Sequence, residues 1–227
     1  MNDTVNSRLQ TFRRMQEFCS SHPADFPPAT LGAQLGTKLS TQLAELTSLT
    51  GSHAADDNAA RQGTDLRADA RDDLRARLKR FSRTAHAIAI TVPGLENKFR
   101  IPRGDNDEEL VAAARAFATD AVEFKDHFIA HAMPATCVED LHTSITKFEA
   151  SMDDQSGAVG DRVGSRVAIN QKLEELMLTR RQLMPIMENT YADDPATLAA
   201  WKRASHIERA ATKKDDEPPP STPAQGK

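Results

Sequence analysis

The chain has 227 residues, enough for one sizeable domain or two small ones. Hydrophobic residues make up 39% of it, charged residues 27% and aromatic residues only 5%, with 10 glycines and 12 prolines. This balance argues against a sheet-rich fold with many turns and indicates long helices. The net charge of −4 is too small to draw the protein strongly toward nucleic acid or acidic lipid.

The sequence carries no recognisable targeting segment. Its first ten residues lack a basic start followed by an apolar run, which disfavours a secretory signal. The longest apolar stretch, 85–92, is far shorter than the roughly 20 residues that a membrane span requires. Cys19 and Cys137, the two cysteines, are interpreted as small buried hydrophobic residues. We therefore expect a cytoplasmic protein without membrane contact.

Apolar residues spaced three and four apart predict a short helix over 3–20. The prolines of HPADFPPAT interrupt it, because each removes a helical hydrogen bond. A second stripe predicts a long helix over 30–92, although its large apolar residues fade between Leu49 and Leu66. The helix either continues there against a closely packed neighbour or breaks near Gly51–Asn58. The Ala-rich sequence without proline favours continuity.

Pro93-Gly94 ends that helix and begins an irregular connection, in which KFRIP is expected to be extended. A helix over 107–131 follows, with Asn106 or Asp107 as its cap. Its apolar residues recur with a 4-3-4-3-4 spacing, the seam of a bundle helix: Leu110, Ala114, Phe117, Ala121, Phe124 and Phe128.

A second long helix is predicted over 135–191. Its middle is polar and contains three glycines, so a break near Gly157–Gly164 stays open. Pro185 is expected to kink or end it. A last helix over 195–210 begins at Pro195, and the Pro-rich tail 212–227 is expected to be disordered.

Together these elements predict an all-α fold. We expect an elongated antiparallel helical bundle with two long helices and about three shorter ones, forming a single domain over 1–211.

Two segments resemble a family of uncharacterised bacterial helical proteins. VPGLENKFRIPR contains the PGL–x3–F–R–x–P connection of that family, and DPATLAAWKRASHIERA contains its LAAW–x2–A–x–H–I–E–R close. The likeness covers most of the chain before the tail. It implies an all-helical fold and a bacterial source, and it carries no activity and no site residues.

Glu123, His127 and His131 are spaced four apart and would form one row on a helix. Imidazoles and a carboxylate in such a row can bind zinc or iron. Bundle metal sites, however, point inward from facing helices. Relative to the apolar stripe, His131 lies at the edge of the core, and His127 and Glu123 lie progressively closer to solvent. An ordinary helix flank is therefore the favoured interpretation, and a metal site would require further ligands. His86, His142 and His206 are available for that role.

A basic row on the first long helix is the second candidate, as a face for an anionic partner: Arg67, Arg71, Arg75, Lys79 and Arg83. Such a face could contact the phosphates of a nucleic acid. Acidic residues run beside the row at spacings that favour pairs within the helix, and the next segment, 104–126, is acidic. Mutual neutralisation of the two segments is favoured over nucleic-acid binding.

No nucleophile with a base and no glycine-rich phosphate loop appears in a readable pattern. The sequence therefore favours a non-enzymatic scaffold or protein-interaction protein that requires no cofactor. Its partner is expected to be a second copy or another protein, because the helix over 107–131 is too short to cover both ends of its long neighbours. The alternative is a metal-binding bundle that uses the row of Glu123, His127 and His131.

Overall fold

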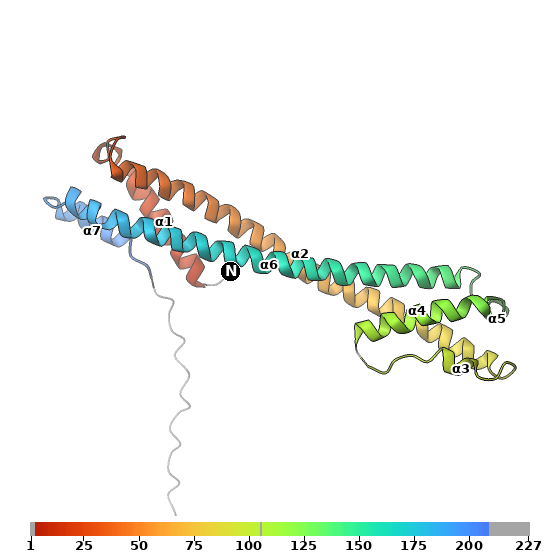
Figure 1. Ribbon diagram of the computed structural model, residues 1–227. Coiled ribbons are helices and arrows are strands. Elements are labelled where there is room, and N and C mark those ends of the chain that lie inside the picture. The colour runs from red at the N-terminus through yellow and green to blue at the C-terminus, as the bar shows by residue number, and fades with distance from the viewer. Residues whose placement is uncertain (1–2, 105, 209–227) are drawn as a thin grey trace, which may run out of the picture. The chain divides into compact units, whose positions relative to one another are not determined.

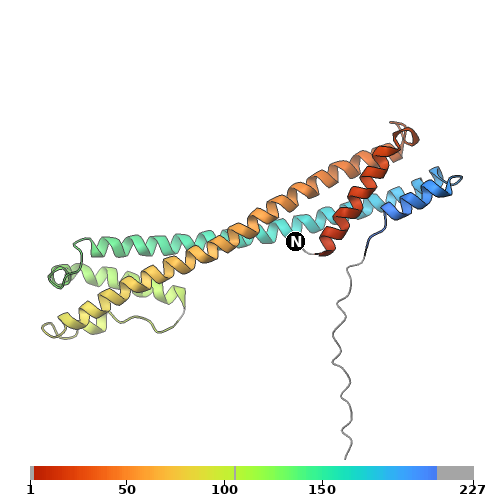
Figure 2. The same ribbon diagram turned by 180° about the vertical axis from the view of Figure 1, so that it is seen from behind.

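The computed structural model describes residues 3–104 and 106–208, and no strand occurs in those residues. Two long helices, α2 and α6, pack antiparallel with shorter helices, as Figure 1 and Figure 2 show. The all-α prediction is therefore confirmed. In chain order the helices are α1 Asp3–Ser21, the 3₁₀ helix η1 Pro23–Asp25, α2 Leu31–Ile88, α3 Leu95–Lys98, α4 Asp107–Glu123, α5 Lys125–Ala130, α6 Cys137–Thr190 and α7 Pro195–Ala204.

Both long helices are continuous. α2 has 58 residues and α6 has 54, so neither breaks near Gly51–Asn58 or Gly157–Gly164. Pro185 lies inside α6, and its ring removes one backbone hydrogen bond. The helix nevertheless continues to Thr190. Pro185 therefore does not end the helix. Within the described residues, no helix is long and apolar enough to cross a membrane.

The internal contacts divide the chain into two units, and each contains a segment of α2 beside a segment of α6. Unit 1 comprises Met1–Gly51 and Val167–Lys227, and unit 2 comprises Ser52–Arg166. The expectation of a single domain over 1–211 stays a prediction.

Unit 1 has a core that α1 and α7 complete. The apolar face of α1 is Leu9, Phe12, Met15 and Phe18, all buried. Trp201 of α7 is fully buried, and its ring centroid lies 5.3 Å from that of Phe18. Tyr191 donates a hydrogen bond to Asp25 Oδ2 at 2.7 Å, and burial together with this bond raises the pKa of its hydroxyl. The terminal helices thus cover the apolar seam that α2 and α6 share in this unit.

Unit 2 has a core built around four phenylalanines from four segments of the chain. The Phe99 ring lies 5.1 Å from Phe117 and 5.2 Å from Phe128, and Phe81 lies 5.1 Å from Phe128. All four side chains are at most 2% exposed. Phe99 comes from the connection between α3 and α4, so this irregular segment supplies the centre of the core.

Polar contacts in unit 2 fix the register of α2 against α6. Residue numbers rise on α2 as they fall on α6, which is the signature of antiparallel pairing. The pairs are His53–Ser165 at 2.9 Å, Asp57–Arg162 at 3.8 Å, Thr64–Gln155 at 3.0 Å and Asp73–Ser144 at 3.0 Å.

The larger differences from the predicted boundaries are three. α2 ends at Ile88 rather than 92, and the N–H groups of Ile90 and Thr91 bond carbonyls three residues back, as at a tightened helix end. The helix over 107–131 is interrupted at Phe124, where the backbone leaves the α region at φ −105° and ψ 13°. The last helix ends at Ala204, and the His206 carbonyl instead accepts hydrogen bonds from Thr11 and Arg14.

The connection after α2 and the C-terminal tail were also given sequence-based expectations. α3 lies in the connection that was expected to be irregular and overlaps the expected extended segment KFRIP only at Lys98. Gly94, at φ 90°, provides the left-handed residue before it. The predicted tail 212–227 and positions 209–210 of the last helix lie outside the described residues.

Removing the Phe99 ring should destabilise the protein strongly. Phe99→Ala leaves a cavity between three aromatic rings, and we expect a loss of about 3–5 kcal/mol in the free energy of unfolding. Urea unfolding followed by circular dichroism measures it. Phe124→Ala is the control, because Phe124 is only partly buried. Equal losses in the two variants would contradict the central position of Phe99.

Ala132 is the one non-glycine residue with positive φ in residues 3–104 and 106–208, at 61°. Left-handed backbone costs an L-residue roughly 1–2 kcal/mol, so Ala132→Gly should stabilise the protein by up to about 1 kcal/mol. The same change at Ala116, exposed within α4, should destabilise by about 1 kcal/mol. Thermal unfolding of both variants tests the opposite signs, and a loss of stability at both positions would contradict the argument.

Candidate functional site

The row of Glu123, His127 and His131 does not form one helical face. Glu123 ends α4 and His127 lies in α5, with Phe124 interrupting the helix between them. The Glu123 carboxylate is 3.6 Å from Lys98 Nζ, and its side chain is 71% exposed. The Nδ1 atom of His131 lies 2.8 Å from the carbonyl oxygen of His127. The carboxylate of Glu123 and the ring of His131 therefore contact neighbouring protein atoms and do not converge on one metal position.

Further ligands do not converge on the row. His127 and His131 are exposed, as are His86, His142 and His206. Among residues 3–104 and 106–208, no group of three or more His, Cys, Asp or Glu side chains is placed to hold a metal ion. Metal binding through Glu123, His127 and His131 stays a prediction.

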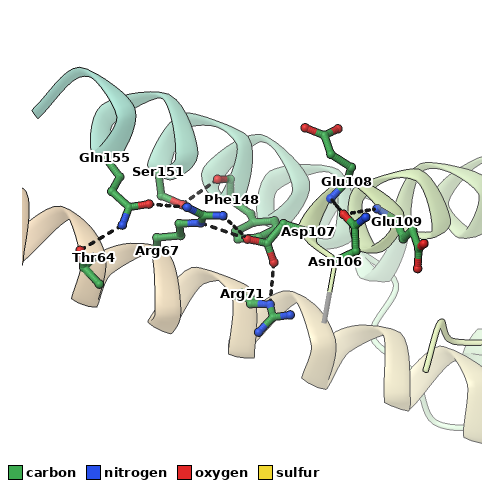
Figure 3. A network of polar contacts seen from close by, with 10 residues as sticks. All are labelled: Thr64, Arg67, Arg71, Asn106, Asp107, Glu108, Glu109, Phe148, Ser151 and Gln155. Atoms are coloured by element: carbon green, nitrogen blue, oxygen red, sulfur yellow. Dashed lines mark hydrogen bonds and ion pairs between the residues drawn. The ribbon is translucent and has the colours of Figure 1, made fainter. Parts of the chain in front are cut away.

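The basic row on α2 makes specific contacts within unit 2 (Figure 3). Arg67 Nε donates to Asp107 Oδ2 at 3.0 Å, and the Arg71 guanidinium lies 2.7 Å from Asp107 Oδ1. Arg67 also donates to the side-chain oxygen of Gln155 on α6. Arg75 donates to the carbonyl oxygen of Gly104 at 2.7 Å. Three of the five basic side chains thus connect α2 to other parts of the unit.

Asp107 is the central group of this network. It is the first residue of α4, and Asn106 caps the same end by accepting from the backbone N–H groups of Glu108 and Glu109. Its side chain is only 13% exposed. A carboxylate at this position is favoured by the helix dipole and by two guanidinium groups. The sequence indicated Asp107 as a cap; its role as the partner of Arg67 and Arg71 was not foreseen.

Lys79 and Arg83 complete the predicted row and are both exposed. In the part of the chain that the structure describes, neither makes a hydrogen bond or ion pair. The five residues therefore do not act as one continuous basic face, because three are engaged in the fold. Association of an anionic partner with the whole row stays a prediction.

The glycines of the polar helix segments fall into two classes. A Cβ atom on Gly63 would lie 3.3 Å from the Cα of Gln155, so the backbones of α2 and α6 approach closely there. A Cβ atom on Gly157, Gly160 or Gly164 would meet nothing within 4 Å. Of these four glycines, Gly63 is the one that packs closely against the described chain, whereas Gly51 on α2 is as open as the three on α6. Beside the α6 glycines, Val159 is 38% and Val163 is 56% exposed.

Unit 1 has a cavity of about 730 Å³ where the end of α1 meets the start of α2. Its walls include Cys19 of α1 and the small residues Gly32, Gly36 and Ser40 of α2. Burial raises the pKa of Cys19 to about 11 and also raises the pKa of Cys137. Both thiols are therefore protonated near neutral pH, and neither is an activated nucleophile.

Replacing the central carboxylate of the network should destabilise unit 2. Asp107→Asn keeps the shape but removes the charge that pairs with Arg67 and Arg71, and we expect a loss of about 1–2 kcal/mol, since both arginines are partly exposed. Glu108→Gln is the matched control, because it removes an exposed carboxylate from the same helix turn. Urea unfolding measures both, and equal effects would contradict the role of Asp107.

Comparisons of this chain with protein-family models, curated proteins and solved structures find no match. The resemblance to the bacterial helical family stays a prediction. Three of the residues that carry it belong to the two cores: Leu95, Phe99 and Trp201 are at most 2% exposed.

Proposed function

We propose that the protein is a non-enzymatic helical scaffold that associates with a second copy of itself. The contact surface is the glycine–valine face of α6, defined by Gly157, Val159, Gly160, Val163 and Gly164. A cytoplasmic location belongs to the same proposal.

One observation carries the proposal: this face combines glycines without an intrachain packing role with exposed valines. Each glycine inside a helix costs about 1 kcal/mol relative to alanine, and a Cβ at Gly157, Gly160 or Gly164 would meet open space. Val159 and Val163 are four apart and Val163 and Gly160 are three apart, so the exposed valine surface lies beside Gly160 on the helix. Packing against another helix would offset both costs.

A second copy suits this face better than a charged partner. The most common symmetric contact uses the same patch on both chains, so the patch must not repel itself. Within 157–164 the charged residues are Asp161 and Arg162. By helical spacing Asp161 lies opposite Val163 but beside Gly157 and Gly164, and Arg162 is paired with Asp57 at 3.8 Å. A contact centred on Gly160 and Val163 therefore leaves both charged residues outside its centre, and a valine from one copy can pack over Gly160 of the other.

The length of the helices no longer supports self-association. The expectation rested on apolar ends that the short helix over 107–131 leaves uncovered. Instead α1 and α7 contribute to the core of unit 1, and α3, α4 and α5 contribute to that of unit 2. The glycine–valine face is the support that remains.

Sedimentation equilibrium of the full chain over a wide concentration range tests the proposal. We expect a monomer–dimer equilibrium that Val163→Glu weakens at least about tenfold, because each copy would bury an unpaired charge. Gly160→Leu should weaken it as well by preventing close approach of the second helix, without destabilising the monomer, since leucine is a good helix former and its Cβ meets open space.

Val122→Glu is the matched control, because Val122 is 63% exposed on α4, away from the face. It should leave the association constant unchanged. A protein that stays monomeric at all concentrations, or a Val122→Glu variant that dissociates as readily as Val163→Glu, would exclude this surface.

A further inference from the structure

A basic pocket lies in unit 2 near the C-terminal end of α2. It has a volume of about 430 Å³ and lies between α2, the segment after α5 and the first turn of α6. Its charged walls are Arg77, Arg80, Arg83 and Asp140, with His131 opposite. Three arginines against one aspartate leave two positive charges in excess when His131 is neutral.

The two unpaired guanidinium groups of the pocket belong to Arg80 and Arg83. Arg77 is engaged, because its Nε donates to Asp73 Oδ2 at 3.2 Å and its Nη1 lies 3.9 Å from Asp140. Asp140 also accepts a hydrogen bond from Thr136 at 3.1 Å, so it already has partners. Arg80 and Arg83 are exposed and make no hydrogen bond or ion pair within residues 3–104 and 106–208.

We infer that this pocket binds a phosphate group through Arg80 and Arg83. A guanidinium group presents several N–H donors in a planar fork that matches phosphate oxygens, and two forks can hold one tetrahedral anion. Arg80 and Arg83 are three apart on α2 and therefore project to neighbouring positions. The volume exceeds that of a single phosphate, so the pocket has room for the group that carries it.

The opposite wall confines the ligand. Ala132, with its positive φ of 61°, and Met133 line the pocket between α5 and α6. His131 Nδ1 lies 2.8 Å from the carbonyl oxygen of His127, so this ring nitrogen is already engaged within the segment. Because the site is a local pocket of about 430 Å³, it suits one phosphate group better than the repeated phosphates of a nucleic acid.

NMR titration with inorganic phosphate tests the inference. The full chain is labelled with ¹⁵N at its arginines. The side-chain Nε–Hε signals of Arg80 and Arg83 should shift and saturate, whereas sodium chloride at equal ionic strength should leave them in place. A second titration with phenyl phosphate distinguishes the source: saturation by both probes indicates that a phosphate ester fits, and saturation by inorganic phosphate alone indicates free phosphate.

Arg80→Gln and Arg83→Gln should each weaken phosphate binding about tenfold, the loss expected for one charge-assisted contact. Lys79→Gln is the matched control: it removes one positive charge from an exposed neighbour that does not line the pocket. Circular dichroism should show unchanged folding in all three. Signals that do not saturate, or a Lys79→Gln variant weakened as much as Arg80→Gln, would overturn the inference.

Discussion

The pairing of α2 with α6 is the constraint on which the rest of each unit depends. Two helices packed together leave part of their shared apolar surface in water, so additional helices must cover it. In unit 1 Trp201 and the buried face of α1 do this, and in unit 2 the ring of Phe99 does it from an irregular segment. The short elements are therefore the parts of the fold that turn two paired segments into a closed core.

The long elements were predictable because periodicity accumulates over many residues. The stripes over 3–20, 30–92 and 135–191 each repeat for several turns, so local deviations did not hide them. The missed features depend on tertiary contacts and carry no local signal. The interruption at Phe124 accompanies the burial of Phe128 against Phe81, and the early end of α7 lets the His206 carbonyl accept from Thr11 and Arg14.

The contrast between local periodicity and tertiary contacts also explains how well the candidate sites were predicted. The row of Glu123, His127 and His131 assumed one straight helix, and the interruption at Phe124 removed that basis. The opposite charges of the basic and acidic segments led to the prediction that they neutralise each other. Which acid pairs with Arg67, however, depends on how α4 packs against α2, and it is Asp107. Arg80 lies outside the predicted row, and only the segment after α5 makes it part of a pocket.

The glycines of α6 pose the remaining energetic question. At Gly63 the helix penalty is offset by the close approach to Gln155, which a larger side chain would prevent. Gly157, Gly160 and Gly164 have no such compensation within the chain. At about 1 kcal/mol each they amount to roughly 3 kcal/mol, a sizeable part of the 5–15 kcal/mol by which native domains are typically stable. The exposed surface of Val159 and Val163, beside Gly160, is a separate cost. A single contact with another helix would reduce both costs at once, whereas changes in intrachain packing elsewhere would reduce neither.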